Sequence, residues 1–328
     1  MSKLIIEPSP HIKSGVTTQK IMLSVIIALL PALVASVWIF GLRALIMTVI
    51  CCTSCVIFEW ACRKIMKRNN TISDLSAVVT GMLLAFNLPV TLPFYMAIIG
   101  CFVAIVIVKQ FFGGIGQNFV NPALAGRIVL LTSFPVAMST WTQPLTWTMS
   151  KLDGITSASP LSSIHEMTSG GAAPDVSLVE MLIGWRAGCL GETCAVALLL
   201  GGIYLVVRKV ISPTIPLTYI GTVAVIMLIA GKGDFRFVAY ELLGGGLMLG
   251  AIFMATDYTT SPITFKGKII FGIGCGLITS IIRIFGNLPE GVSYSIIIMN
   301  ILVPLIENVT LPKPFGTPKK EKKEAEAK

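Results

Sequence analysis

The sequence predicts an all-α polytopic membrane protein with about ten transmembrane helices. Of its 328 residues, 54% are hydrophobic and only 12% are charged, and the mean hydropathy is +0.84. A soluble domain has about 25% charged residues, so a water-soluble globular protein is excluded. One membrane-spanning helix needs about 20 apolar residues, and ten of them fit within this length and leave residues for loops and tails.

Ten apolar segments are separated by charged residues or turn residues. We expect the third segment to be broken or tilted, because it is short and ends in Asn87-Leu88-Pro89. The expected spans are Ile21–Phe40, Ala44–Ala61, Leu75–Leu88, Phe94–Val108, Pro122–Met138, Thr193–Val207, Ile215–Ala230, Ala239–Ala255, Ile269–Ile284 and Val292–Ile306.

The distribution of basic residues predicts the orientation. With the N-terminus placed in the cytoplasm, 19 of the 25 Lys and Arg residues fall on the cytoplasmic side and six outside. This bias follows the positive-inside rule, so we expect both termini to be cytoplasmic. Topology therefore explains the net charge of +9, and we expect no nucleic-acid partner. The expected regions are a cytoplasmic segment 1–20, a first five-helix half 21–138, an external loop 139–190, a second half 191–306 and a charged cytoplasmic tail 307–328.

Breaks in the apolar pattern suggest two halves. Gly113-Gly114-Ile115-Gly116 precedes the fifth segment, Gly244-Gly245-Gly246 lies within the eighth, and Asn87-Leu88-Pro89 recurs as Asn287-Leu288-Pro289. Glycine and proline interruptions in two halves are typical of inverted-repeat membrane proteins. The match is short, so two inverted five-helix halves and a chance recurrence both stay open.

The external loop contains the segment Asp153–Leu161, DGITSASPL. It can form an exposed turn, because Asp and Gly favour turns and Pro160 stops a helix. It can also present a hydroxyl group that accepts a covalent modification. Composition alone favours the turn.

A second segment, Gly113–Arg127, precedes and begins the fifth span. Asn121 suits a helix N-cap and Pro122 the first helical position. Irregular glycine backbone at membrane depth is tolerated only where it is buried or lines a cavity. The amides of Asn118 and Asn121 could pair with a flat heterocycle that has alternating carbonyl and N–H groups. A capped helix with packing glycines is the alternative.

Charged residues near the ends of the spans have simpler explanations. We expect Glu59 to form an interfacial ion pair with its basic neighbours. Arg283, Glu290 and Glu307 can extend their side chains toward the membrane surface. Asp257, in the segment FMATDYTTSP, can be a helix-end carboxylate or part of a cation pathway.

Four of the eight cysteines, Cys51, Cys52, Cys55 and Cys62, lie on one apolar stretch. A metal site would need a completing set of ligands, and no histidine or second Cys-x-x-Cys lies nearby. We therefore expect small side chains that pack between helices and no metal site.

Several motifs occurring in order give a more specific result. GGIGQNFVNPALAGR, DGITSASPL, FMATDYTTSP and GNLPEGVSYSIIIMNILVPLIE together resemble the RnfD/NqrB family, the flavin-carrying membrane subunits of ion-pumping redox complexes. The resemblance covers nearly the whole chain and is closer to the RnfD branch.

The resemblance implies a covalent flavin on the external loop. In that family a flavin transferase joins FMN through its phosphate to a hydroxyl residue in a pattern similar to Asp-x-x-Ser/Thr-x-Ala-Thr. Here Asp153 matches the acid, Thr156 the inner hydroxyl, Ala158 the alanine and Ser159 the acceptor. Serine departs from the usual threonine. Ser159 could carry FMN, Thr156 could replace it, or the flavin could be held without a bond; we favour Ser159, then Thr156.

The resemblance also implies a second flavin, non-covalent riboflavin, at the Asn-x-x-Asn-Pro segment. That carries a binding role to Asn118 and Asn121, with Gly114 and Gly116 allowing close approach of the backbone.

The implied function is that of a membrane electron-transfer component of an ion-translocating (Na⁺ or H⁺) ferredoxin:NAD oxidoreductase complex, which is not catalytic alone. The implied location is the inner membrane of a bacterium. Implied partners are membrane lipid, the flavin transferase, and the other Rnf proteins: RnfG, which bears flavin, RnfA and RnfE in the membrane, RnfB with iron–sulfur clusters, and RnfC with the NADH site. From the residues alone, a flavin-free ten-helix solute transporter or channel stays open, because broken helices and buried asparagines suit it equally.

Overall fold

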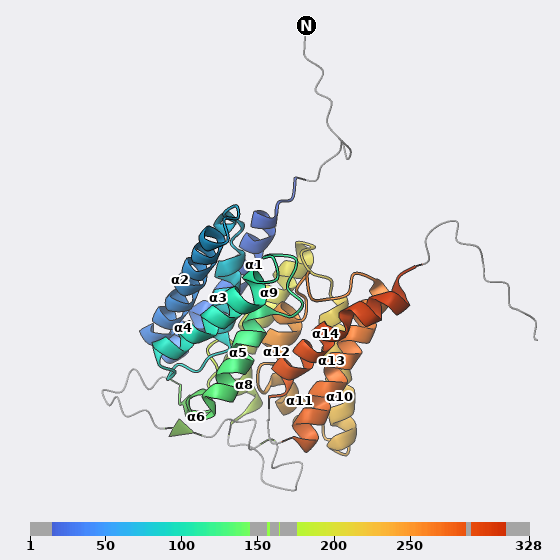
Figure 1. The fold of residues 1–328 in the computed structure, drawn as a ribbon. Helices are drawn as coiled ribbons and strands as arrows, with labels where there is room; N and C mark the ends of the chain where they lie inside the picture. Colours follow the sequence, from blue (N-terminus) through green and yellow to red (C-terminus); the bar gives the residue numbers. More distant parts are fainter. Residues whose placement is uncertain (1–14, 145–155, 158–163, 165–175, 287–289, 313–328) are drawn as a thin grey trace, which may run out of the picture.

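The computed structural model describes residues 15–144, 156–157, 164, 176–286 and 290–312. These residues form a bundle of helices. In the view of Figure 1, helices from the first part of the chain lie on the left, helices from the last part lie on the right, and the labels of α5, α9 and α12 fall between them. The interior is one continuous cluster of buried apolar side chains contributed by both parts.

Four helices are long and apolar enough to cross a membrane. They are α1 (Thr18–Phe40), α2 (Leu42–Ile65), α13 (Phe265–Phe285) and α14 (Val292–Thr310). The side chain of Thr17 caps the start of α1 by accepting from the backbone N–H of Lys20. Gly41, at φ 78°, then makes the sharp turn into α2, a backbone conformation that favours glycine.

Six further apolar segments bring the described total to ten, matching the ten predicted segments and confirming a polytopic membrane fold. One of the six is the bent pair described below, and the other five are shorter helices. The shorter helices are α3 (Ser76–Phe86), α4 (Phe94–Phe102) continued by the π-helix η2 (Val103–Gln110), α5 (Pro122–Ser133), α9 (Ala195–Val207) and α10 (Thr214–Ala230). With 11 residues, α3 is about 16 Å long and cannot cross a hydrocarbon core of about 30 Å alone. The expectation of a short third span is confirmed.

The predicted eighth span is not one continuous helix. It consists of α11 (Phe235–Leu243) and α12 (Leu247–Leu249), which continues as the π-helix η4 (Gly250–Met254). The two parts meet at an angle of 66°. The bend falls at Gly244-Gly245-Gly246, where Gly245 has φ 62°, so the glycines mark a helix break as their sequence suggested.

The predicted fifth span is also interrupted. After α5, Phe134 has non-helical backbone angles and Pro135 starts the short helix α6 (Pro135–Met138). Proline cannot donate a backbone hydrogen bond, and it disfavours helical angles at the residue before it. The single span Pro122–Met138 is therefore corrected to two helices.

The described remainder of the chain contains short elements. These are the 3₁₀ helix η1 (Ile72–Asp74), the strands β1 (Trp141–Thr142) and β2 (Thr156–Ser157), and α8 (Leu178–Ile183). The strands pair antiparallel, with Thr142 opposite Thr156. A capping box between Ser177 and Glu180 starts α8.

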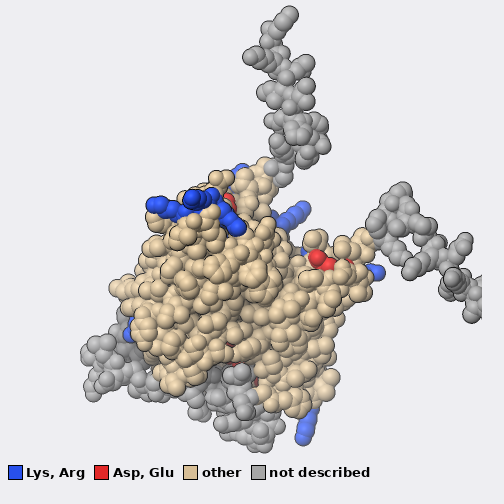
Figure 2. Space-filling model, in the orientation of Figure 1, with Lys and Arg blue, Asp and Glu red and all other residues tan. Residues whose placement is uncertain are grey.

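The start of α1 and the end of α14 lie at the same end of the bundle. Thr18 and Thr259 line one cavity, and the cap residue Thr264 of α13 bonds Thr310, hydroxyl to hydroxyl, at 2.7 Å. Figure 2 shows Lys and Arg gathered at the upper end of the face it presents, the end at which Figure 1 shows α1 beginning. This arrangement fits an even number of crossings; assigning that end to the cytoplasm rests on the Lys and Arg distribution.

A buried connection enters the bundle from the other end. Residues 184–194 join α8 to α9, and most of them are buried. The backbone N–H of Gly191 donates to the carbonyl of Phe86 at 2.9 Å, and that of Leu190 to Leu88 at 3.1 Å. A Cβ at Gly191 would lie 2.2 Å from the Cβ of Phe86, so this approach requires glycine. The connection holds the end of α3 in place.

The division into two inverted halves stays a prediction. Asn87 follows the third apolar segment, whereas Asn287-Leu288-Pro289 follows the ninth and lies outside the described residues.

Candidate functional site

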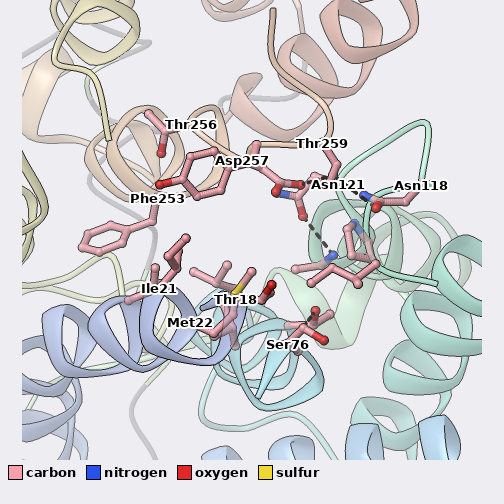
Figure 3. A pocket seen from close by; sticks show the side chains of 18 of the residues that line it. Thr18, Ile21, Met22, Ser76, Asn118, Asn121, Phe253, Thr256, Asp257 and Thr259 are labelled. Carbon is pink, nitrogen blue, oxygen red and sulfur yellow. Dashed lines mark hydrogen bonds between the residues drawn. The ribbon is translucent and has the colours of Figure 1, made fainter. Parts of the chain in front are cut away.

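A cavity of about 390 Å³ lies between elements from the two parts of the chain. Figure 3 shows residues of α1 on one side of it, with Phe253 of η4 and the connection that follows η4 on the other. Both π-helices, η2 and η4, contribute to its wall; π-helical turns are rare and often occur at functional sites. Residues that line it are Thr18, Ile21, Met22, Ser76, Thr80, Lys109, Gly116, Asn118, Asn121, Phe253, Asp257 and Thr259.

Asn121 forms the predicted N-cap of α5 and also bonds the end of η4. Its side-chain oxygen accepts from the backbone N–H groups of Ala123 at 3.0 Å and Leu124 at 3.4 Å. Its side-chain nitrogen donates to the carbonyl of Met254, at the end of η4, at 3.2 Å. Both lone pairs of the amide oxygen are therefore used within the fold. Asn121 closes the cavity by joining α5 to η4, so the capping interpretation is confirmed at this residue.

Asn118 also lines the cavity, and its side-chain oxygen accepts fewer hydrogen bonds than that of Asn121. Its side-chain nitrogen donates to the carbonyl of Val120 at 3.1 Å, and its oxygen accepts from the hydroxyl of Thr259 at 3.1 Å. An amide oxygen has two lone pairs, so one stays available for a ligand. Of the two asparagines, Asn118 has the greater capacity to hydrogen-bond a bound molecule.

The two predicted glycines have different places. Gly116 lines the cavity at φ 89°, and a Cβ there would have nothing within 4 Å. Gly114, at φ 108°, lies against Arg63: a Cβ would be 2.1 Å from its guanidinium nitrogen. Gly114 therefore lets the loop pack on α2, whereas Gly116 leaves open space beside the cavity.

The facing wall is the connection after η4. Asp257 accepts hydrogen bonds from the hydroxyls of Thr259 at 3.1 Å and Thr260 at 3.3 Å. Burial raises the pKa of the Asp257 carboxyl, and hydrogen bonds from Thr259, Thr260 and Asn118 oppose that shift. Since Thr259 also bonds Asn118, polar groups from the two parts of the chain form one connected wall.

Asn300 on α14 supports this wall and was not among the predicted site residues. With its amide oriented to satisfy both polar atoms, Asn300 accepts from the backbone N–H of Asn121 at 3.1 Å and donates to the carbonyl of Thr260 at 3.0 Å. It lies in the motif SIIIMNILVP, where a lone buried asparagine among apolar residues is the feature that could have identified it.

Lys109, another residue of the wall, forms a buried ion pair. The ammonium of Lys109, at the end of η2, lies 2.8 Å from the carboxylate of Glu59 on α2 and donates to the hydroxyl of Ser76 at 2.7 Å. Glu59 also accepts from Thr71 at 2.8 Å. The expectation that Glu59 pairs with its basic neighbours at the membrane surface is wrong, because its partner is 50 residues away and both side chains are buried.

The external loop is described only in part. Thr156 lies in β2, paired through its backbone with β1. Asp153 and Ser159, the other candidate residues of the FMN segment, lie outside the described residues.

A network of charged side chains, separate from the residues that line the cavity, surrounds Arg127 and Arg283. Arg127 on α5 donates to Asn87 at 2.8 Å, to Ser293 at 3.1 Å and to Glu290. Arg283 on α13 pairs with Glu241 at 2.8 Å. The expectation that Arg283 and Glu290 extend toward the membrane surface is therefore wrong.

Backbone carbonyl groups of Gly244 and Glu192 also belong to this network. Arg283 also donates to the carbonyl of Gly244, at the bend between α11 and α12, at 3.1 Å. Arg186 donates to the carbonyl of Glu192 at 2.7 Å. The arginines thus satisfy carbonyl groups that the broken helix and the buried connection leave without regular partners.

One part of this network has the composition of a metal site. Cys189, Glu192 and Glu290 place one ligand atom each within 4.8 Å of one another. Arg127 donates to both Cys189, at 3.7 Å, and Glu290, so a guanidinium already supplies the positive charge. Burial also raises the pKa of the Cys189 thiol, which disfavours the thiolate that a metal requires.

The cysteines of α2 pack against neighbouring helices. Cys51 and Cys55 are fully buried. A Cβ at Gly81 of α3 would lie 2.8 Å from the backbone of Cys51 and Cys52, so the two helices approach closely there. The thiol of Cys101 donates to the Cys51 carbonyl at 3.6 Å. The packing interpretation fits these contacts.

Comparison with known proteins gives consistent matches over the whole chain. The model of the NQR2, RnfD, RnfE family matches residues 5–316. The chain is 48% identical over 325 residues to the D subunit of the Na⁺-translocating ferredoxin:NAD⁺ oxidoreductase complex of Acetobacterium woodii, covering 99% of this chain and 98% of the relative. It is 42% identical over 323 residues to the D subunit of the proton-translocating ferredoxin:NAD⁺ oxidoreductase complex of Clostridium ljungdahlii, with 95% and 96% covered. A third relative, the D subunit of the ion-translocating oxidoreductase complex of Stutzerimonas stutzeri, is 37% identical over 327 residues, with 92% of each chain covered.

Proposed function

Because the chain belongs to the NQR2, RnfD, RnfE family, we propose that it is the membrane-embedded D subunit of an ion-translocating ferredoxin:NAD oxidoreductase complex. The relatives named for that role align with the chain almost from end to end. The proposed work of the subunit is electron transfer within the membrane. A flavin-free solute transporter has no comparable support and is set aside.

The observation that carries a flavin role is the cavity between the two parts of the chain. Its volume of about 390 Å³ lies in the range of sites for small molecules and cofactors, which are mostly apolar with a few placed polar groups. Apolar side chains such as Met22 and Phe253 suit the faces of a flat ring, and Asn118 with Lys109 suits its polar edge. The residues present therefore fit a non-covalent flavin such as riboflavin.

Each wall has a distinct task in this proposal. Asn118 hydrogen-bonds the ring edge, Asn121 fixes the distance between α5 and η4, and Gly116 leaves room beside the loop. The apolar residues of α1 exclude water from the ring. When bound, the flavin accepts and releases electrons, and the protein groups supply position and electrostatics.

We also propose that the external loop carries FMN in a phosphoester, with Ser159 favoured and Thr156 second. The described helices on either side of the loop, α6 and α8, lie toward the lower end of the bundle in Figure 1, whereas α1, whose first residues line the cavity, begins at the upper end. The two flavins would then lie on different sides of the membrane, with the cavity on the cytoplasmic side. Ferredoxin and NAD would be handled by partner proteins of the complex.

Two measurements test the two flavin proposals separately. For the covalent FMN, mass spectrometry of peptide 152–161 from the assembled complex should show the mass of FMN joined to Ser159 or Thr156. Unmodified peptide throughout would reject the covalent proposal.

For the non-covalent flavin, acid extraction of the purified protein should release riboflavin. An Asn118→Ala variant should release less while peptide 152–161 stays modified. Equal riboflavin from the variant and the parent chain would reject the cavity as its site.

A further inference from the structure

The cavity wall is electrically asymmetric. Among the described residues that line it, Lys109 is the basic one and Asp257 the acidic one. They come from different parts of the chain, Lys109 from η2 and Asp257 from the connection after η4. The Asp257 carboxyl already accepts hydrogen bonds from the hydroxyls of Thr259 and Thr260, and burial raises its pKa.

Lys109 is held in one position. Its ammonium contacts Glu59 at 2.8 Å and Ser76 at 2.7 Å, and only 3% of the residue is exposed. Glu59 contacts the lysine from α2 and is not among the residues that line the cavity. An occupant of the cavity would therefore be nearer to the ammonium than to the carboxylate behind it.

An ammonium in this place favours an occupant that gains negative charge. Reduction of an isoalloxazine by two electrons with uptake of one proton leaves one negative charge, spread over the N1 and C2 carbonyl edge. In a buried site of low polarity, a nearby fixed positive charge stabilises that form over the neutral oxidised ring. The oxidised ring is neutral, so the ammonium stabilises its binding only weakly.

We propose that Lys109 is a positioning residue that sets the reduction potential of the flavin in the cavity, by holding an ammonium beside the ring edge that becomes negative. This inference rests on the proposed function, since it assumes that the occupant is a flavin. It predicts that Lys109 strengthens binding of the reduced flavin more than binding of the oxidised flavin.

The test uses the full chain, expressed without the flavin transferase so that riboflavin is its only flavin, purified in detergent and titrated with dithionite while the flavin absorbance is recorded. Lys109→Met should lower the midpoint potential by at least about 30 mV, which corresponds to a tenfold loss of preference for the reduced form of a two-electron couple. Lys109→Arg, which keeps the charge, should lie near the parent chain. Lys266→Met, which removes an exposed lysine near the start of α13 that does not line the cavity, should leave the potential unchanged.

Lys109→Met leaves Glu59 buried without its partner and could fail to fold. The double variant Glu59→Gln/Lys109→Met avoids that charge. It should still lower the potential, by less than the single variant, because the nearer of the two charges is lost. A lysine that only joins α2 to η2 would give no shift in the double variant.

The outcomes separate the two proposals. A chain that binds riboflavin with the same potential in the parent, Lys109→Met and double variants overturns the role of Lys109 and leaves the flavin site intact. A parent chain, and an assembled complex, that contain no riboflavin overturn the proposed function of the cavity itself.

Discussion

Two regions where helices break are built in different ways. At one end of the bundle, the start of α5 and the end of η4 face a cavity lined by Asn118, Asn121 and Asp257. Toward the other end, the end of α3 and the bend before α12 meet Arg127 and Arg283, whose charges are paired with Glu290 and Glu241. Both regions satisfy irregular backbone inside a membrane protein.

The difference indicates which region binds a ligand. In the charge network, the guanidinium groups of Arg127 and Arg283 donate to the carboxylates of Glu290 and Glu241 and to the carbonyl of Gly244. Around the cavity, the amide of Asn121 joins α5 to η4, and the open volume of the cavity lies beside it. We infer that the charge network holds the broken helices together and that the cavity is the ligand-binding site. The predictions below test this contrast in order of decreasing effect.

Loss of Arg127 should have the largest effect on stability. Arg127→Met leaves the buried Asn87 and Ser293 and the partly buried Glu290 without this donor. Breaking a buried ion pair costs about 3–5 kcal/mol, so thermal unfolding of the variant in detergent should occur at a clearly lower temperature. Arg236→Met, at an exposed arginine beside the start of α11, is the matched control and should change stability by less than about 0.5 kcal/mol. Equal unfolding temperatures for the two variants would contradict the claim that the charge network stabilises the fold.

Asn121 should affect both stability and flavin binding. Asn121→Ala removes the cap of α5 and the bond to Met254, and loss of a helix cap costs about 0.5–2 kcal/mol. The variant should unfold earlier and retain less riboflavin on gel filtration.

Asn118→Ala removes the bonds of Asn118 to Val120, Thr259 and Asp257 but no helix cap. It should lose riboflavin with a smaller loss of stability than Asn121→Ala. The reverse order, with Asn118→Ala the less stable of the two, would contradict the division of tasks between the asparagines.

Asp257 should make stability depend on pH. Because burial raises its pKa in the folded chain, the folded state holds a proton that the unfolded state has already released. The stability that this proton contributes is therefore present at low pH and lost as pH rises from about 4 through the raised folded value. Each pKa unit corresponds to about 1.4 kcal/mol.

Asp257→Asn should flatten this dependence. The difference in unfolding temperature between the variant and the parent chain, measured from pH 4 to 8, should grow in favour of the variant as pH rises. A difference that stays constant, or that falls with pH, would contradict the raised pKa.

Local sequence features predicted much of this arrangement. Runs of apolar residues placed ten segments, Asn121-Pro122 predicted the start of α5, and Gly244–Gly246 marked the bend of 66°. These succeed because caps, glycine breaks and apolar spans depend on residues close together in the chain.

The ion pairs could not be predicted in the same way. Lys109 and Glu59 are 50 residues apart and Arg127 and Glu290 are 163 apart, so their pairing depends on how the helices pack. Near a span end, a charged residue that reaches the surface and one that pairs internally have the same local sequence. Asn300 was missed for the same reason: its partners, Asn121 and Thr260, come from other elements.

We propose that this protein carries flavin both in the cavity and on the external loop. The most direct measurement is a flavin analysis of the protein isolated from the assembled complex, combining acid extraction with mass spectrometry of its peptides. We expect extracted riboflavin together with an FMN-modified peptide 152–161. A colourless protein that releases no riboflavin and yields only unmodified peptide would contradict it.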